Sequence, residues 1–599
     1  MSRVATLHHP ISSWRLSLAS GAYVPACLRQ DCDQNASRSL PGCARGTTPR
    51  LPVCYKAPAL VKTGNHFCLR RLRRGDLCPV GRLSVAISCR RVYRATRVLL
   101  LGEILRRHAH VRPQKTAYVV GDMRVGYADF NRQANRLAHA LRALGVRRGD
   151  RVAILADNCA QYPIAYFGCI KLGAILVPVN ARFKDDEVHY VVAHSESSVL
   201  LFGPAYAGAV ERLRPRWSHV RHYAALQADA FAAWIEPYPA EEPLATIDEH
   251  DPHVMLYTSG TTGQPKGALL SQRAYYLQAG HSHHSTGLSE EDVGLSMFPM
   301  FHMGGWALPL GFWYDGGSVV IMERAEPRAM LEAVQRERVT YLYAVPTLYT
   351  RMLDLPDFDR FDRSSLRVLG SGTSVMTQAQ VQHIVERFDN RHLFIIYGST
   401  EAGPVAMLRP VDLMRKPGSV GRPALNVELR IVDDDDRELP PGTAGEIVCR
   451  SELNMLGYWR MPEETAATLR GGWVHTGDLG VLDEDGFLFI AGRKKEMIKS
   501  GGENIFPVEV ERTLLEHPAI VEAAVLGVPD AEWGESVLAV VVRRPGGRLS
   551  EAEVIEHVRA RLAGFKKPRY VWFVDALPRT AATRQVQKTL LREQFLAVR

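Results

Sequence analysis

The sequence predicts an α/β protein with a large N-terminal α/β domain of layered sheets, which ends in a β-rich subdomain, and a small mobile C-terminal α+β domain. Short apolar strands alternate with helical repeats from Ile104 onward, and hairpin patterns replace them after Val427. A basic, glycine-containing connector at 492–504 then precedes a new set of strands and helices. The 599 residues allow several cores, because a domain usually has roughly 150 residues.

Residues 1–98 differ in composition from the rest of the chain. They hold 17 Lys and Arg against three acidic residues, whereas the remainder holds 57 against 61. The slightly acidic body therefore gives no electrostatic reason to bind nucleic acid. We interpret 1–98 as a basic leader: an organelle transit segment, a disordered basic arm, or upstream sequence translated from an early start codon, with the last favoured.

The cysteines and the hydropathy pattern bear on whether the protein binds zinc, is held by disulfides or spans a membrane. Seven of the ten cysteines fall within 1–98 without a CxxC pair, and the other three are widely scattered. No zinc site or disulfide framework is indicated, so we expect a reduced, cytoplasmic body. No apolar stretch reaches the roughly 18 residues that span a bilayer, which predicts no transmembrane helix. Peripheral membrane contact stays open, and the sequence indicates no oligomeric state.

The first half of the body shows alternating strand and helix patterns. Thr116–Val120 and Arg151–Leu155 are predicted strands, separated by a helix from Tyr127 to Leu144 that Gly145 ends. Further strands and helices alternate through 166–172, 174–177 and 199–202. This alternation indicates a largely parallel sheet with helices on its faces.

The stretch 257–267, Tyr-Thr-Ser-Gly-Thr-Thr-Gly-Gln-Pro-Lys-Gly, predicts a phosphate-binding loop. Glycines let backbone amides approach an anion, hydroxyls add donors, and Lys266 supplies a mobile positive charge. The spacing is close to that of a Walker loop, but Pro265 takes the second glycine position and Gly267 replaces the hydroxyl residue that would hold magnesium. The metal ligand must therefore come from another segment.

Glu401 is the candidate for that ligand. Leu393–Ile396 is a predicted strand, and Tyr397-Gly398-Ser399-Thr400-Glu401 follows at its carboxyl end, where ligands of open α/β sheets bind. A carboxylate beside a hydroxyl can hold Mg²⁺ against phosphate oxygens. The sequence thus predicts a magnesium site at Glu401.

Several other stretches have simpler interpretations. The run 433–436 of four aspartates is predicted to be a solvated hairpin turn rather than a metal site. Asp478 follows a glycine and could accept two ribose hydroxyls. His302 lies alone in the apolar stretch 297–306, and His281, His283 and His284 are predicted surface histidines without metal-site spacing.

The connector at 492–504 predicts a domain boundary. After it, 508–515 and 551–562 are predicted helices, and 521–526 and 537–542 are predicted strands. The predicted division is therefore a large domain at 99–494 and a small domain at 495–599.

The four motifs TSGTTGQPKG, YGSTE, TGDLG and GRKKEMIKSGGENIFPVEVE, in this order, resemble the adenylate-forming superfamily of acyl-CoA synthetases, peptide-synthetase adenylation domains and beetle luciferases. The resemblance covers roughly Leu99 to Arg599. Because no carrier-protein module follows and the last motif contains GENIFPVEVE, it points to the acyl-CoA synthetase and fatty-acid–CoA ligase branch.

The resemblance implies an AMP-forming ligase that uses ATP, Mg²⁺ and coenzyme A to activate a small carboxylic acid through an acyl-adenylate. The implied nucleotide and phosphate residues are Thr258, Ser259, Gly260, Thr261, Thr262, Gly263, Lys266, Gly372, Thr373, Ser374, Tyr397, Gly398, Thr400, Asp478 and Arg493, with Glu401 as the metal ligand. The implied acyl-pocket residues are His302 and Trp306, the hinge is Lys495, and the implied thiolation and coenzyme A residues are Lys499, Gly501, Gly502, Lys566 and Lys567.

The chain departs from the family pattern near its C-terminus. Gln585 stands where the family has a lysine that contacts the reacting carboxylate and phosphate, and Arg584 stands where glycine is usual. Arg584 could take over the role of that lysine, or the protein could be an adenylate-binding pseudoenzyme. Gly372-Thr373-Ser374 also differs from the usual GAP-like triplet, and Gln272 replaces a common histidine.

The apolar stretch 297–306 favours a medium- or long-chain fatty acid as the substrate. An aryl carboxylic acid is the alternative. A flat aromatic pocket around Phe298, Trp306 and Tyr343 would distinguish the aryl substrate from the alkyl one.

Overall fold

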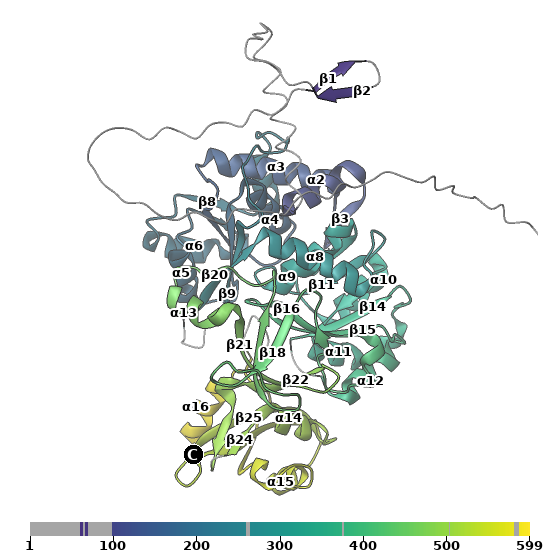
Figure 1. Ribbon diagram of the computed structural model, residues 1–599, viewed down its shortest axis with the longest axis vertical. Coiled ribbons are helices and arrows are strands. Elements are labelled where there is room, and N and C mark those ends of the chain that lie inside the picture. The colour runs from purple at the N-terminus through teal and green to yellow at the C-terminus, as the bar shows by residue number, and fades with distance from the viewer. Residues whose placement is uncertain are drawn as a thin grey trace, which may run out of the picture. The chain divides into compact units, whose positions relative to one another are not determined.

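A computed structural model describes residues 60–63, 66–69, 99–258, 264–373, 376–501, 503–579 and 586–598. The chain divides into two units, Met1–Ser84 and Val85–Arg599, each described by itself. In the first, β1 (Leu60–Thr63) pairs antiparallel with β2 (His66–Leu69). The remaining elements belong to the second unit (Figure 1).

The first sheet of this unit is mainly parallel. Its strand order is β20-β10-β9-β6-β5-β7-β8, and only the β9–β10 and β10–β20 pairs are antiparallel. Its strands are β5 (Arg151–Leu155), β6 (Ile175–Val179), β7 (Val199–Phe202), β8 (His222–Ala225), β9 (Pro252–Thr258), β10 (Lys266–Ser271) and β20 (Gly457–Tyr458). Because helices cover both faces, β5 and β6 are almost continuous buried apolar runs. The predicted strands 151–155 and 199–202 are confirmed.

The second sheet has the order β17-β16-β15-β14-β13-β11-β12-β3-β4, parallel from β15 through β3. Its strands are β3 (Thr116–Val120), β4 (Met123–Gly126), β11 (Val293–Ser296), β12 (Ser318–Ile321), β13 (Tyr341–Tyr343), β14 (Val368–Gly372), β15 (Leu393–Ser399), β16 (Gly403–Leu408) and β17 (Arg422–Pro423). The parallel strands end at one edge, so the segments that follow β11, β13, β14 and β15 meet there.

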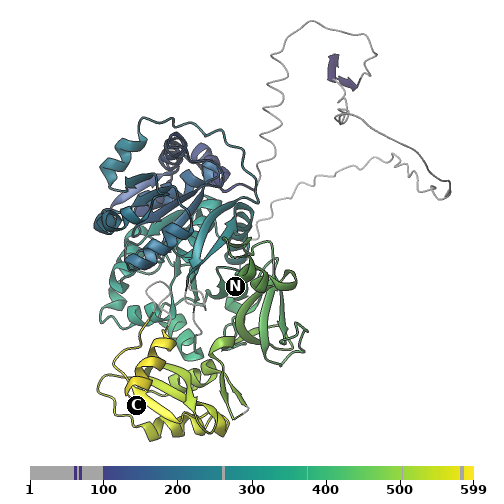
Figure 2. The same ribbon diagram turned by 90° about the vertical axis from the view of Figure 1, so that its left-hand side faces the viewer.

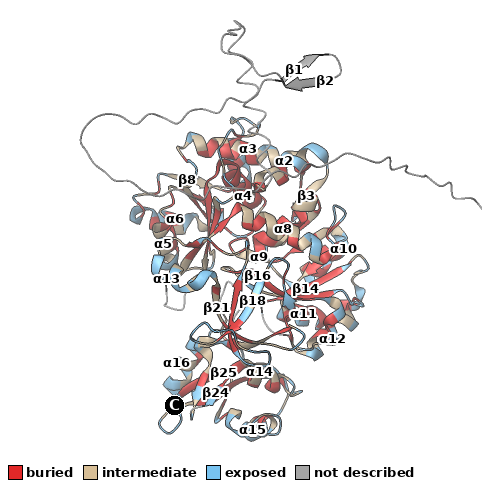
Figure 3. Cartoon of the chain, in the orientation of Figure 1, coloured by how far each residue is buried: buried red, intermediate tan, exposed pale blue. Residues whose placement is uncertain are grey.

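The helices of the large domain pack on these sheets. They are α2 (Leu101–Val111), α3 (Tyr127–Ala143), α4 (Gln161–Leu172), α5 (Asp185–His194), α6 (Ala207–Leu213), α7 (Ala228–Ile235), α8 (Gln272–Thr286), α9 (Met303–Asp315), α10 (Pro327–Glu337), α11 (Pro346–Leu353), α12 (Gln378–Arg387) and α13 (Pro462–Thr468). The predicted end of α3 is confirmed, since Gly145 adopts a φ of +88° just after it. Residues of α3, α4, α8 and α9 share one apolar core with both sheets, and Figure 3 shows this buried interior in red.

The β-rich subdomain is the antiparallel sheet β18-β19-β21-β22, drawn in green in Figure 2. Its strands are β18 (Glu428–Val432), β19 (Gly445–Arg450), β21 (Val474–Leu482) and β22 (Leu488–Arg493). The aspartate run 433–436 lies in the turn after β18, as predicted, and most of it is exposed. The turn also forms ion pairs, from Asp434 to Lys494 and from Asp436 to Arg470.

The residues after 495 form their own sheet and core. The sheet has the order β24-β23-β26-β25, with β27 parallel to β26. Its elements are β23 (Ile498–Ser500), β24 (Glu503–Ile505), α14 (Pro507–Leu515), β25 (Ile520–Asp530), β26 (Gly534–Arg543), α15 (Glu551–Arg559), β27 (Tyr570–Phe573) and α16 (Lys588–Val598). The observed strands β25 and β26 are longer than the predicted strands 521–526 and 537–542, because they form one extended hairpin. The predicted helix 551–562 ends earlier, at Arg559.

Candidate functional site

A cavity of about 1770 Å³ lies where the parallel strands end. Thr258 ends β9, Tyr343 ends β13, Thr373 follows β14, and Thr400 and Glu401 follow β15. The predicted site residues that line this cavity are Thr258, Lys266, His302, Thr373, Tyr397, Gly398, Thr400, Glu401, Asp478, Arg493 and Lys495. Residues far apart in sequence therefore meet at the sheet edge at which open α/β sheets bind ligands.

Glu401 is held in place by two hydroxyls. Its Oε1 accepts hydrogen bonds from Thr258 Oγ1 at 3.1 Å and from Tyr458 Oη at 2.9 Å. Burial, together with the neighbouring Glu401 charge, raises the pKa of Tyr458, so its hydroxyl keeps its proton and donates. The other carboxylate oxygen has no partner among the described residues, which leaves it free to face a ligand or a cation.

Tyr458 is a site residue that the sequence analysis missed. It lies on β20, which pairs with β10, so Tyr458 sits opposite Ala268 and near Lys266 at the start of β10. The Lys266 Nζ lies 5.2 Å from the centre of the Tyr458 ring, within the range of a cation–π contact. Tyr458 thus contacts the predicted phosphate lysine and the predicted metal ligand together. No local motif marks this residue, because its role depends on strand pairing.

Asp478 forms a second polar group on β21. One oxygen accepts from Tyr397 Oη at 2.7 Å, and the other pairs with Arg493 Nε at 2.7 Å. Burial raises the pKa of Asp478, while Arg493 and Tyr397 act in the opposite direction. A carboxylate has about four lone-pair positions, so a diol could still bind beside these two partners.

Thr373 has an unusual backbone conformation. Its φ of +71° lies in the left-handed region, which a β-branched residue rarely adopts. The preceding Gly372 belongs to β14 and does not line the cavity, but a Cβ there would lie 2.5 Å from the Ile396 carbonyl oxygen. Strained residues of this kind cluster at ligand sites, so this backbone fits a binding role for the segment.

The opposite part of the cavity is aromatic and apolar. Phe298 lies 5.6 Å from Tyr343 and 6.4 Å from His302, measured between ring centres, and these three residues line the cavity. His302 caps α9 by accepting from the Gly304 amide, and burial lowers the pKa of His302 to about 4, so the ring is neutral at pH 7. We call this region, with the cavity-lining residues of α8 and α9, the α9 side. The loop side comprises Thr258, Lys266, Glu401, Tyr458 and Asp478.

Two predictions for this region were wrong. Trp306 does not line the cavity: its side chain is 0% exposed and stacks on Tyr166 at 3.7 Å in the core. The turn of α9 after His302 points Trp306 away from the cavity, toward α4. His281 is not a surface histidine, since it is 5% exposed and lines the cavity, whereas His283 and His284 are exposed.

Comparisons with known proteins identify the family. The family model for AMP-binding enzymes matches residues 105–459, and the family model for the C-terminal domain of AMP-binding enzymes matches residues 509–584. The chain belongs to the AMP-binding enzyme family. The predicted membership of the adenylate-forming acyl-CoA synthetases is thereby confirmed.

The AMP-binding enzyme has relatives with different substrates. It is 37% identical to an indoleacetate–CoA ligase of Aromatoleum aromaticum and 33% identical to the long-chain-fatty-acid–CoA ligase FadD13 of Mycobacterium tuberculosis. Each match covers 83% of this chain and 99% of the relative. The solved structure of the anthranilate CoA ligase AuaEII with anthranoyl-AMP matches with a TM-score of 0.78 and 32% identity, over 84% of this chain and 98% of that one. The fold prediction of a large and a small domain agrees with these neighbours.

Not all predicted residues of the AMP-binding enzyme reach the cavity. Lys499, Gly501, Lys566 and Lys567 do not line it, and Lys566 forms an ion pair with Glu509 at 2.7 Å. The predicted residues outside the described part of the chain are Ser259, Gly260, Thr261, Thr262, Gly263, Ser374, Gly502, Arg584 and Gln585.

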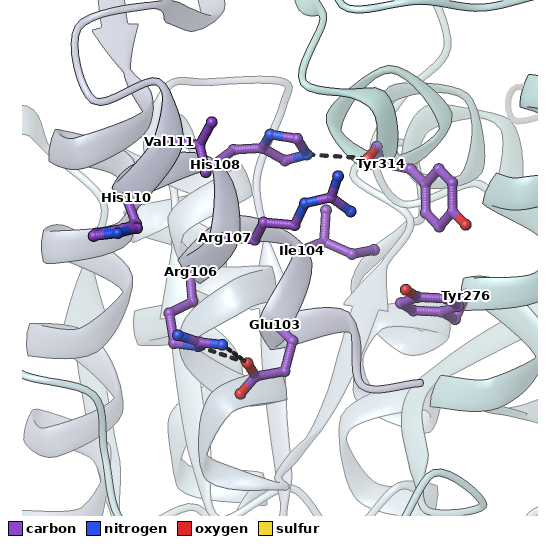
Figure 4. A pocket seen from close by; sticks show the side chains of 9 residues that line it. All are labelled: Glu103, Ile104, Arg106, Arg107, His108, His110, Val111, Tyr276 and Tyr314. Atoms are coloured by element: carbon purple, nitrogen blue, oxygen red, sulfur yellow. Dashed lines mark hydrogen bonds and ion pairs between the residues drawn. The ribbon is translucent and has the colours of Figure 1, made fainter. Parts of the chain in front are cut away.

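A smaller cavity of about 340 Å³ lies between α2, α8 and α9 (Figure 4). Within it Arg106 pairs with Glu103, and the His108 Nε2 lies 3.0 Å from the Tyr314 carbonyl oxygen. No residue predicted for the nucleotide, the acid or the metal lines this cavity. In the described part of the chain, no helix has both the length and the apolar character needed to cross a membrane.

Proposed function

We propose that the protein is an AMP-forming CoA ligase that activates an aromatic carboxylic acid through an acyl-adenylate and transfers it to coenzyme A. The observation that carries this proposal is the composition of the main cavity. Lys266 and the carboxylates of Glu401 and Asp478 line its loop side. The aromatic side chains of Phe298 and Tyr343 line its α9 side. One cavity can therefore hold a nucleotide and a hydrophobic acid next to each other.

In this proposal residues of the loop side and two neighbouring residues, Thr400 and Arg493, bind the parts of ATP. Lys266 and Thr258 bind the outer phosphates, Thr400 binds the α-phosphate, and Asp478 with Arg493 binds the ribose. The acid carboxylate attacks the α-phosphorus and pyrophosphate leaves; the thiol of coenzyme A then attacks the acyl carbon and AMP leaves. Donors that are already positioned for phosphate charge lower the barrier of the first step.

The chemistry of Glu401 also fits a magnesium ion. One carboxylate oxygen accepts two hydrogen bonds, and the other has no partner among the described residues. Mg²⁺ is usually bound by one or two carboxylates together with substrate phosphates and water. When bound, the ion would neutralise negative charge on the phosphate oxygens. Thr258 and Tyr458 would hold the carboxylate in one orientation.

The residues of the small domain would act in the second step. The resemblance supports rotation of this domain about Lys495, which lines the cavity. The rotation would bring Lys499, Gly501 and Gly502 toward the acyl-adenylate, with Lys566 and Lys567 near the coenzyme A phosphates. Lys566 would then exchange its Glu509 partner for a phosphate.

The aromatic cluster favours an aryl acid over the fatty acid that the sequence analysis ranked first. Two of the three residues proposed to form an aryl pocket, Phe298 and Tyr343, line the cavity and pack at 52° to each other. Aromatic side chains prefer such tilted or edge contacts with another ring. A fatty acid is the second candidate, because Met297, Met303 and Leu308 also line the cavity and the FadD13 ligase is a relative.

Incubation of the full-length protein with ATP, Mg²⁺, coenzyme A and a panel of aryl and alkyl acids tests the proposal. We expect AMP, pyrophosphate and an aryl-CoA thioester, detected by mass spectrometry. Turnover of alkyl acids alone would favour the second candidate. Tight binding of acyl-adenylate analogues without any thioester would indicate the pseudoenzyme, and a gain of adenylation in the Gln585→Lys variant would then identify Gln585 as the cause.

A further inference from the structure

We propose that four polar residues of α8 recognise a hydroxyl or amino substituent on the aromatic acid, at the end remote from its carboxylate. The residues are Gln278, His281, Ser282 and Thr286, which we call the α8 wall. The inference rests on the proposed CoA-ligase function and names its substrate class more closely.

The two helices that border the α9 side present opposite chemistry to the cavity. From α9, the lining residues are Met303, Gly304, Ala307 and Leu308, which are apolar or lack a side chain. From α8, the lining residues are the α8 wall, and each of them is polar. They occupy positions i, i+3, i+4 and i+8 of α8, which places them on one helical face. A plain alkyl pocket would not need such a face.

The α8 wall has hydrogen-bonding capacity that the protein does not use. The Gln278 amide has no hydrogen-bond partner among the described residues. Ser282 and Thr286 donate their hydroxyl protons to the carbonyl oxygens four residues earlier, at 3.2 and 2.8 Å, and so present acceptor lone pairs. The wall therefore offers both an unused donor and unused acceptors, which suits a hydroxyl or an amino group.

His281 adds a neutral ring to this wall. Its Nε2 lies 3.0 Å from Ser285 Oγ, which leaves Nδ1 without a partner among the described residues. Burial and the neighbouring His284 lower the pKa of His281, so the imidazole is uncharged at neutral pH. The wall thus selects an uncharged polar group rather than a second carboxylate.

Ser282 lies far along α9 from His302. A Cβ on Gly311 would lie 3.3 Å from Ser282 Cβ, so Ser282 is beside Gly311 of α9. Gly311 lies eight residues after Met303, which corresponds to roughly 12 Å along the helix from the end that His302 caps. An acid whose carboxylate lies near His302 would therefore meet Ser282 only with the end that is remote from the carboxylate.

The discrimination has its physical basis in desolvation: a polar side chain that loses its hydrogen bonds to water and gains none from the ligand costs free energy. An unsubstituted ring or an alkyl end against Gln278 would desolvate the amide and give it no partner. A site that hydrogen-bonds a substrate hydroxyl discriminates strongly against the analogue that lacks it. We expect a preference of tenfold or more, because water still reaches parts of this cavity.

The test compares matched acids in the full-length protein. The kcat/KM values for thioester formation are measured with cinnamic acid, 4-hydroxycinnamic acid and decanoic acid. The wild type should prefer 4-hydroxycinnamic acid over cinnamic acid at least tenfold. Gln278→Leu should reduce this ratio about tenfold and Ser282→Ala by a smaller factor, with cinnamic acid used as well as before. His283→Ala, an exposed position on the same helix that does not line the cavity, is the matched control and should leave the ratio unchanged.

A binding measurement separates this inference from the proposed function. The sulfamoyl-adenosine analogues of the two cinnamic acids bind without any chemical step, and their affinities are measured by calorimetry in each variant. A preference for the hydroxylated analogue that Gln278→Leu abolishes supports the α8 wall even if no thioester forms, in which case only the ligase function fails. The inference would be overturned if the wild type bound the two analogues with affinities within twofold of each other. It would also be overturned if neither Gln278→Leu nor Ser282→Ala changed the ratio of the two affinities. In both cases thioester formation would still support the ligase function.

Discussion

Glu401 on the loop side and Gln278 on the α9 side are polar residues of one cavity, but their surroundings differ. Glu401 accepts from two hydroxyls, and Asp478 is held by Tyr397 and Arg493. Gln278 and the Tyr343 hydroxyl have no hydrogen-bond partner among the described residues. The loop side is therefore organised before a ligand binds, which suits an invariant nucleotide. The α9 side keeps polar groups available, which suits a substrate that differs between relatives.

The largest expected effect is at Lys266 on the loop side. Lys266→Ala should lower kcat by about 100- to 1,000-fold, because loss of one charge-stabilising donor commonly costs about 2.7–4 kcal/mol in the transition state. The measurement is pyrophosphate release with saturating acid. Lys266→Arg, which keeps the charge, is the control and should retain more activity. An unchanged rate in the alanine variant would remove Lys266 from the phosphate site.

Tyr458→Phe isolates the hydroxyl that holds Glu401. The variant keeps the ring near Lys266 but removes a hydrogen bond to a carboxylate, worth about 1.5–3 kcal/mol. We expect kcat/KM for ATP to fall roughly 10- to 100-fold, with a higher magnesium requirement. Titration of the rate with magnesium checks this result. If the variant matched the wild type at every magnesium concentration, the loop side would not depend on this organisation.

Phe298→Leu tests the α9 side and should have a smaller effect. Aromatic pairs contribute about 0.5–1.5 kcal/mol beyond the area that they bury, so the preference for aryl over alkyl acids should fall roughly 2- to 10-fold. The KM for ATP should not change, because Phe298 does not contact the loop-side residues. An equal loss for aryl and alkyl acids would show that Phe298 supports the fold rather than selects the substrate.

The smallest expected effect is on the pH dependence of stability. Burial lowers the pKa of His302 to about 4, so between pH 4 and the ordinary value of 6.5 the unfolded chain binds this proton and the folded protein does not. This contribution to stability is complete above pH 6.5 and is lost as the pH falls. Between pH 7.5 and pH 6, the free energy of unfolding in urea should decrease by about 0.8 kcal/mol less in His302→Asn than in the wild type. Asparagine can still cap α9, and equal decreases in the two proteins would mean that His302 is not held neutral.

Much of the loop side could be predicted from the sequence, because its residues belong to contiguous motifs. A strand followed by hydroxyls, glycines and one lysine led to Thr258 and Lys266, and a strand end led to Glu401; all three line the cavity. Phosphate binding by this loop stays a prediction, and 259–263 lie outside the described residues. The strands at 116–120 and 151–155 followed from short apolar runs between turn residues. These features depend on neighbours within a few residues, so local patterns are sufficient to find them.

The tertiary structure decided which side chains share the cavity. Tyr458 joins Glu401 and Lys266 only because β20 pairs with β10, and pairing between distant strands leaves no local pattern. Trp306 and His302 come from the same apolar stretch, yet the helix directs one into the core and the other into the cavity. His281 is likewise covered by packing that its neighbours in sequence do not reveal. The sequence determines the chemical groups and the local elements, whereas long-range packing sets the direction and burial of each side chain, because both depend on contacts with segments far along the chain.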